Sequence, residues 1–82
     1  MRPSLSEIAA IICRLLRNDG LPITISARFD SLPGWEEMDL MRVVEDVECR
    51  FDVQFNLTEI DRLQTVGDLL RMAEAKQVLE VA

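Results

Sequence analysis

Apolar residues recur at intervals of three and four in the first part of the chain, which is the spacing of one buried helix face. They are Leu5, Ile8, Ile11, Ile12, Leu15 and Leu16. Ser4 and Glu7 have the spacing of a capping box, in which each side chain accepts a hydrogen bond from the other residue's backbone N–H. We therefore expect a first helix that starts after Ser4 and ends at residues 18–20, with Gly20 at positive φ.

Residues 20–35 show no sustained helical period and contain two glycines and two prolines, so they predict a long ordered loop. Ile23 and Ile25 alternate with polar residues as in a short strand, but the chain offers no second strand to pair with them. The apolar side chains of this loop are expected to fold back onto the core, with Trp35 as a packing anchor: Leu21, Ile23, Phe29, Leu32 and Trp35.

A second helix is predicted to begin after Gly34, at Glu36. Its buried stripe would consist of Leu40, Val43, Val44, Val47 and Phe51, and its outward positions of Glu36, Glu37, Arg42, Glu45 and Glu48. Acidic residues in a first turn face the positive end of the helix dipole, which is worth about 0.3–1 kcal/mol each at an exposed site. The acidic start of this helix therefore has a structural explanation of its own.

The remaining residues predict an extended link over 51–55, a short helix within 58–63 and a last helix capped by Thr65. The short helix would bury Leu57, Ile60 and Leu63. The last helix would bury Val66, Leu69, Leu70, Met72, Ala73 and, near its end, Leu79. The pattern as a whole predicts an all-α, four-helix bundle in one domain over 1–82, with three long helices, one short helix and a long loop between the first two.

Composition narrows the functional classes. With 82 residues the chain forms one small core and has little room for a deep catalytic cleft. The net charge of −6, concentrated between Glu36 and Asp52, argues against nucleic acid and favours a basic protein surface as partner. No apolar run approaches the roughly 20 residues that span a bilayer, and no signal peptide precedes the first helix. We therefore expect a monomeric cytoplasmic protein without membrane insertion.

The sequence offers no set of residues for catalysis or for metal binding. The chain has no histidine, so its serines and cysteines lack that activating base. Cys13 and Cys49 are isolated within apolar helical patterns, so we expect neither a disulfide nor a zinc site, and we expect both thiols to be buried or partly buried. The sequence therefore favours a binding protein over an enzyme.

The order of elements resembles that of an acyl carrier protein over nearly the whole chain. Three segments carry the resemblance. They are the Leu32-Pro33-Gly34-Trp35 turn, the acidic second helix with its terminal Phe51 and extended residues to Phe55, and the Thr65-Val66-Gly67-Asp68-Leu69-Leu70 start of the last helix. The resemblance implies a carrier that presents a thioester-linked acyl, aminoacyl or peptidyl group to enzymes of fatty acid, polyketide or nonribosomal peptide synthesis.

In that family an Asp-Ser pair at the start of the second helix carries 4′-phosphopantetheine on the Ser hydroxyl. Counting forward from Trp35 and back from Phe51 both place Glu37 at the position of this Ser, and a carboxylate cannot form the phosphodiester. Asp30-Ser31-Leu32 spells the family tripeptide, which makes Ser31 an alternative attachment site. Ser31 lies six residues too early, and Pro33-Gly34 would then fall inside the helix that should carry it.

The resemblance also implies a docking surface on the second helix, at Glu36, Met38, Met41, Glu45 and Glu48. Methionine adapts its shape to a partner, and carboxylates attract Arg and Lys, so these residues suit the basic surface of a synthase, ligase or transferase. The alternative is an ordinary solvated helix face. Likewise, Glu37 either starts the helix or mimics the phosphodiester charge of a loaded carrier. The chain is thus predicted to be a degenerate carrier that docks, an active carrier modified at Ser31, or a regulatory interaction module.

Overall fold

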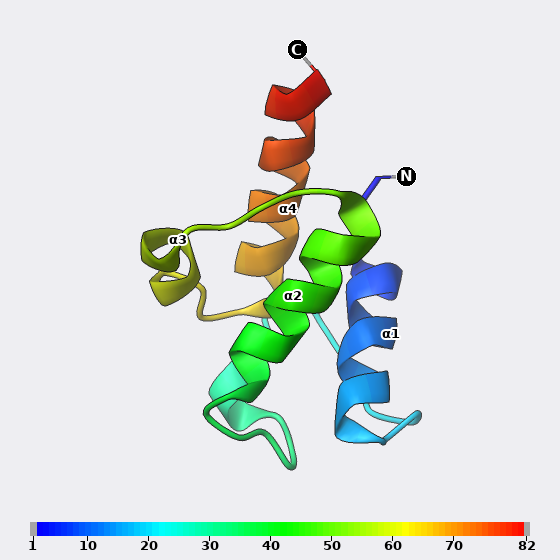
Figure 1. Cartoon of the computed structure of the whole chain (residues 1–82). Coiled ribbons are helices and arrows are strands. Elements are labelled where there is room, and N and C mark those ends of the chain that lie inside the picture. Colours follow the sequence, from blue (N-terminus) through cyan, green and yellow to red (C-terminus); the bar gives the residue numbers. More distant parts are fainter. Residues whose placement is uncertain (1, 82) are drawn as a thin grey trace.

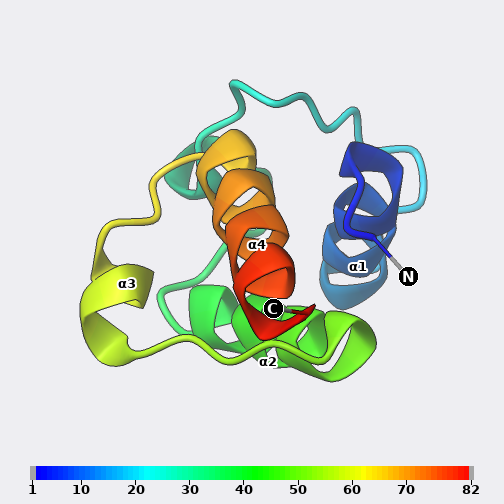
Figure 2. The same ribbon diagram turned by 90° about the horizontal axis from the view of Figure 1, so that it is seen from above.

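The computed structural model describes the backbone of residues 2–81 and the side chains of residues 2–77. Its helices are α1 (Leu5–Leu16), α2 (Asp39–Phe51), α3 (Leu57–Asp61) and α4 (Val66–Val81), with a 3₁₀ turn, η1 (Phe29–Ser31), in the loop between α1 and α2. The three longer helices surround the core, and the short α3 lies beside α4 on the side away from α1 (Figures 1 and 2). The predicted all-α bundle of three long helices and one short helix is confirmed.

The core lies where the three longer helices meet. α1 contributes Ile8, Ile11 and Ile12; α2 contributes Val43, Val44, Val47 and Phe51; and α4 contributes Val66, Leu69 and Ala73, all of them buried. Leu40 and Leu70 are only partly buried against this cluster. Leu79, predicted to belong to the inner face of α4, lies outside the residues whose side chains are described.

Both ends of α1 differ from the prediction in detail. The Ser4 Oγ accepts a hydrogen bond from the Glu7 N–H (3.3 Å), as expected, but the Glu7 carboxylate instead accepts one from the Arg50 Nε of α2 (2.6 Å). At the other end Arg17, not Gly20, takes the left-handed conformation (φ 55°). This conformation lets the Asn18 N–H reach the Cys13 carbonyl (3.0 Å), which satisfies a helix-end carbonyl and stops α1 before the glycine.

The long loop is ordered, as predicted, and hydrogen bonds fasten it to the start of α4. The Ala27 carbonyl accepts from the Val66 N–H (2.9 Å) and the Ile25 carbonyl from the Gly67 N–H (2.8 Å). No strand forms within residues 2–81, where Arg28 and Thr65 make one isolated β-bridge. The expected apolar side chains pack against the core, and Trp35 stacks on Phe29 with ring centroids 5.2 Å apart. The loop therefore has a fixed position relative to α4.

The short α3 is capped and tied to α4 by polar contacts. Asn56 and Glu59 form a reciprocal capping box, and the Glu59 carboxylate also pairs with Lys76 of α4 (2.8 Å). The Lys76 ammonium lies over the Phe55 ring, 5.4 Å from its centroid. The prediction that Leu57 is buried is wrong: it is 71% exposed, whereas Ile60 near the end of α3 and Leu63 just after α3 are buried in the core.

Thr65 caps α4, as predicted, and Asp68 completes the cap. The Thr65 Oγ1 accepts from the Asp68 N–H (3.1 Å), while the Asp68 carboxylate accepts from the N–H groups of Gln64 (3.0 Å) and Thr65 (3.1 Å). The bond from the Gln64 N–H is the largest cause that holds the pKa of Asp68 below its ordinary value, and the Thr65 bonds add to it. The ionised carboxylate therefore stabilises the fold.

We expect Asp68→Asn to lower the free energy of unfolding at pH 7 by about 1 kcal/mol. Because the folded pKa is depressed, the stabilisation is complete above the unfolded pKa of about 3.9 and is lost as the pH falls through the lower folded pKa. Asn does not titrate, so the free energy of unfolding of the variant should fall less than that of the natural chain between about pH 5 and pH 3. Urea unfolding at each pH measures both effects. Asp19→Asn, at an exposed loop position, is the matched control, and an equal loss in both variants would refute the capping role.

Candidate functional site

The start of α2 is built by a turn that precedes the helix. The Asp39 N–H donates to the Glu36 carbonyl (3.0 Å), and the Asp39 carboxylate accepts from the Glu36 N–H (2.8 Å). These two bonds close residues 36–39 into a turn, so the prediction that α2 begins at Glu36 is wrong, and its first residue is Asp39. Asp39 is only 5% exposed and is the acid of the first turn, where the helix dipole favours it.

Glu36, Glu37 and Met38 all lie at the surface of this turn. Met38 is 67% exposed, an unusual exposure for a large apolar side chain. The Glu37 side chain is likewise exposed, at the position where the family resemblance places a modified serine. The turn therefore presents one carboxylate pair and one thioether to solvent just ahead of α2.

Ser31, the alternative attachment residue, is separated from α2 by a second turn. It ends η1, is exposed, and its hydroxyl donates to the Asp30 carboxylate (3.5 Å). Arg28 hydrogen-bonds the same carboxylate and is the largest cause of the lowered pKa of Asp30. The Trp35 N–H then bonds to the Leu32 carbonyl (3.1 Å), with Gly34 at φ 78°, before α2 is reached. Ser31 is thus accessible but does not lie on the helix.

The remaining predicted partner residues divide into two groups. Met41 is 40% exposed and Glu45 is exposed, so both are free to meet a partner. Glu48 is half-buried, and its carboxylate accepts a hydrogen bond from the Phe55 N–H (2.7 Å). Glu48 therefore holds the link between α2 and α3 in place, a use that sequence spacing did not indicate.

Four exposed positions of α2 were not predicted as partner residues, and one of them, Arg50, pairs with Glu7 of α1. Arg42, Asp46 and Cys49 all face solvent, and the expectation that Cys49 is buried is wrong, whereas Cys13 is partly buried as expected. Cys49 lies four residues after Glu45 and seven after Arg42, so helical spacing places it on the same side as these charges. That spacing was the available signal for its exposure.

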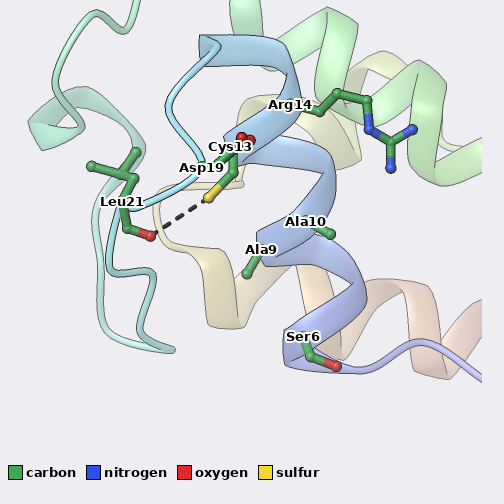
Figure 3. Close-up of a pocket in the computed structure, with 7 residues that line it drawn as sticks. All are labelled: Ser6, Ala9, Ala10, Cys13, Arg14, Asp19 and Leu21. Atoms are coloured by element: carbon green, nitrogen blue, oxygen red, sulfur yellow. Dashed lines mark hydrogen bonds between the residues drawn. The ribbon is translucent and has the colours of Figure 1, made fainter.

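Two open hollows flank α1. One, of about 230 Å³, lies between α1 and α2 and is lined by Ile11, Arg14, Asp46, Cys49 and Arg50. The other, of about 500 Å³, shares Arg14 with the first and is lined also by Ala9, Ala10 and Leu21 (Figure 3). There the Cys13 thiol donates to the Leu21 carbonyl (3.5 Å), while Arg14 points away from Leu21. Among the described residues no group of three metal-ligating side chains is found.

Comparison with known proteins defines the class to which this fold and site belong. The profile of the phosphopantetheine attachment site family matches residues 6–73, which is most of the chain. The chain is 30% identical over 71 residues to the acyl carrier protein of Thermotoga maritima, covering 87% of this chain and 88% of that one. It is 28% identical over 72 residues to the acyl carrier protein of Exiguobacterium sp., covering 88% and 91%. The chain therefore belongs to the phosphopantetheine-attachment family of acyl carrier proteins.

Solved structures agree with this assignment. The fold matches holo acyl carrier protein from Geobacter metallireducens with a TM-score of 0.83 over 94% of this chain and 88% of that one, at 21% identity, which by itself shows the fold alone. It also matches a putative acyl carrier protein from Mycobacterium tuberculosis with a TM-score of 0.74 and 27% identity, over 82% and 89%. The predicted carrier-protein type of bundle is thereby confirmed. No helix in the described residues is long and apolar enough to cross a membrane.

The group that this family carries, 4′-phosphopantetheine, requires a side-chain hydroxyl for its phosphodiester. Residues 36–39 supply three carboxylates and one thioether, and no hydroxyl. The Asp39 carboxylate is moreover committed to the Glu36 N–H within the turn. The start of α2 therefore does not fit attachment of this group.

Proposed function

We propose that this chain is a degenerate carrier domain that docks to a biosynthetic enzyme without carrying 4′-phosphopantetheine at the start of α2. The single observation that carries the proposal is the exposed Glu37 in a well-formed turn at the position of the expected serine. The fold around this position is complete, since the core, the loop anchors and the caps are all present. Loss of the hydroxyl has thus left the docking scaffold intact.

The exposed part of the turn and of α2 is the proposed docking surface. Met38 and Met41 offer adaptable apolar contact, and Glu36, Glu37 and Glu45 offer negative charge, a combination that suits a synthase, ligase or transferase with basic groups. Glu37 places a permanent charge where a loaded carrier would hold its phosphodiester. The enzymes in question belong to fatty acid, polyketide or nonribosomal peptide synthesis.

A second candidate function, an active carrier modified at Ser31, has one observation in its favour. The Ser31 hydroxyl is exposed and so is accessible to a modifying enzyme. Against it, Ser31 ends a three-residue 3₁₀ turn, and the Gly34 turn separates it from α2. A purely regulatory interaction module would use the same α2 surface. It would differ from a degenerate carrier only in the protein that it binds.

The test is to incubate the chain with coenzyme A and a phosphopantetheinyl transferase and to measure its intact mass. We expect the natural chain to keep its mass and Glu37→Ser to gain one phosphopantetheine arm, because the variant restores a hydroxyl on an otherwise intact scaffold. Adding Glu45→Lys to Glu37→Ser should slow the modification about tenfold at low salt by removing a docking charge.

Ser31→Ala is the matched control for the competing site. Modification of the natural chain that disappears in Ser31→Ala would establish Ser31 as the attachment residue and overturn the proposal. A Glu37→Ser chain that folds, by circular dichroism, yet takes no arm would argue against a preserved docking surface. An unchanged rate in the Glu45→Lys double variant would argue against docking through α2.

A further inference from the structure

The charges on the exposed side of α2 are not all of one sign. Arg42 is followed at helical spacing by Glu45 and Asp46, and it is preceded in the turn by Glu36 and Glu37. All five are exposed. Residues three and four apart lie on one side of a helix, so Arg42, Glu45 and Asp46 share a side of α2, while Glu36 and Glu37 lie in the exposed turn just ahead of it. The exposed charges therefore follow the order acidic, basic, acidic along the chain.

Contacts within the fold remove other charges from this surface. The Glu48 carboxylate is bound to the Phe55 N–H (2.7 Å), and Arg50 pairs with Glu7 of α1 (2.6 Å). Glu48 thus bonds to the link that follows α2, and Arg50, although it is still partly exposed, lies beyond Asp46 near the end of α2. Arg42 is therefore the cation that stands between the two acidic pairs.

The partner of Arg42 within the fold does not cancel its charge at the surface. Arg42 bonds to the Asp39 carboxylate at 3.4 Å, but its side chain remains 61% exposed, whereas that of Asp39 is 7% exposed. The pair therefore has one buried member, the carboxylate, and one exposed member, the guanidinium. An approaching protein therefore meets the guanidinium and is kept away from the carboxylate beneath it.

We propose that Arg42 selects the docking partner: the enzyme surface that fits α2 carries a carboxylate opposite Arg42, between basic groups that face Glu36–Glu37 and Glu45–Asp46. The inference rests on the proposed docking function and specifies its partner. From Arg42 to Glu45 the helix rises only about 4.5 Å, so one partner patch spans both signs. A partner with a uniformly basic patch would place a cation against Arg42. The repulsion between these like charges would weaken binding and so exclude such a partner.

The test uses a phosphopantetheinyl transferase with a basic carrier-docking patch as the probe, and it measures the Kd for the unmodified chain. Arg42→Glu should bind about tenfold more tightly than the natural chain at low salt, and most of the gain should vanish at about 0.5 M salt. Arg42→Gln should bind with intermediate affinity. Arg2→Glu makes the same change of charge at an exposed residue ahead of α1, outside the docking surface, and should alter the Kd less than twofold.

A second arm reverses the basic residues of the transferase patch to Glu, one at a time. One reversal should tighten binding of the natural chain and weaken binding of Arg42→Glu, a crossed pattern that only a direct charge pair produces. The inference is overturned if Arg42→Glu and Arg2→Glu change the Kd equally, if Arg42→Glu fails to bind while folded by circular dichroism, or if every reversal weakens binding of the natural chain. Tighter binding by Arg42→Glu together with an unmodified Glu37→Ser would count against the proposed function alone.

Discussion

Replacing Leu69 with alanine is expected to lower the free energy of unfolding by about 3 kcal/mol, because large-to-small changes at fully buried leucines lose transfer energy and leave a cavity. Leu69 has 0% exposure and belongs to the part of α4 that joins the common core. A domain of this length has a total stability of roughly 4–12 kcal/mol. The variant should therefore melt roughly 12–24 °C lower. Thermal unfolding measures this shift, and urea unfolding measures the loss of free energy.

Leu57→Ala is the matched control for this prediction, since it makes the same chemical change at a leucine that is 71% exposed. It should change the stability by less than about 0.5 kcal/mol. Similar losses in both variants would mean that Leu69 is not part of a close-packed core. A clear loss in Leu57→Ala alone would reverse the assignment of which leucine holds the helices together.

Gly67→Ala is expected to destabilise the fold by about 1–3 kcal/mol, although Gly→Ala within a helix ordinarily stabilises by about 1 kcal/mol. The sign changes because of the loop that crosses the start of α4. A Cβ at Gly67 would lie 2.6 Å from the Ile25 Cγ2 and 2.9 Å from the Ile25 carbonyl oxygen. That carbonyl is fixed by its hydrogen bond from the Gly67 N–H (2.8 Å), so it cannot withdraw without losing the bond. Urea unfolding measures the loss.

Gly20→Ala serves as the control, because a Cβ there meets nothing within 4 Å and should leave the stability nearly unchanged. Combining Gly67→Ala with Ile25→Ala removes the contact with the side chain but keeps the contact with the carbonyl, so the double variant should recover part of the loss. A stabilised Gly67→Ala chain would show that the loop yields readily and is not held against α4.

The helices and most of the core could be predicted from periodicity, because a helix that buries one face has apolar residues at intervals of three and four. Ile8, Ile12, Val43, Val47 and Leu69 are buried as that spacing indicates. Leu57 was mispredicted by the same rule, because a five-residue helix has too little length for its spacing to fix which turn meets the core. Periodicity is therefore dependable for the three longer helices alone.

The helix ends were harder to predict than the helices, because they depend on which of several hydrogen bonds forms. The sequence allowed Glu7 to complete a capping box, but the Glu7 carboxylate accepts a hydrogen bond from Arg50, which lies far away in the chain. It allowed α2 to begin at Glu36, but the Asp39 side chain closes a separate turn there. The first choice is settled by a contact that exists only after α1 and α2 have packed, and the second by a local side-chain bond that competes with the first turn of the helix.

Helical spacing predicted which residues of the candidate site are exposed, but it did not predict the hydrogen bonds that they make. Exposure of Glu36, Glu37, Met38, Met41 and Glu45 agrees with the docking surface inferred from the sequence, although its use in binding remains a proposal. Glu48 looked equivalent to Glu45 by spacing, yet it lies close enough to the backbone after α2 to bind the Phe55 N–H. The helical period predicts the side of the helix on which a residue lies, but it does not predict which nearby backbone group will hydrogen-bond to its side chain.

The attachment of the long loop to α4 also bears on the order in which the chain can fold. Ala27 and Ile25 bond to the N–H groups of Val66 and Gly67, which come about 40 residues later in the chain. Contacts between such distant segments form late, since the intervening chain must first be closed into a loop. The loop that leads into the Glu37 turn would thus gain its anchors only once α4 is present. A nascent chain that still lacks α4 would be unable to present a finished docking surface, which couples recognition by a partner enzyme to completion of the fold.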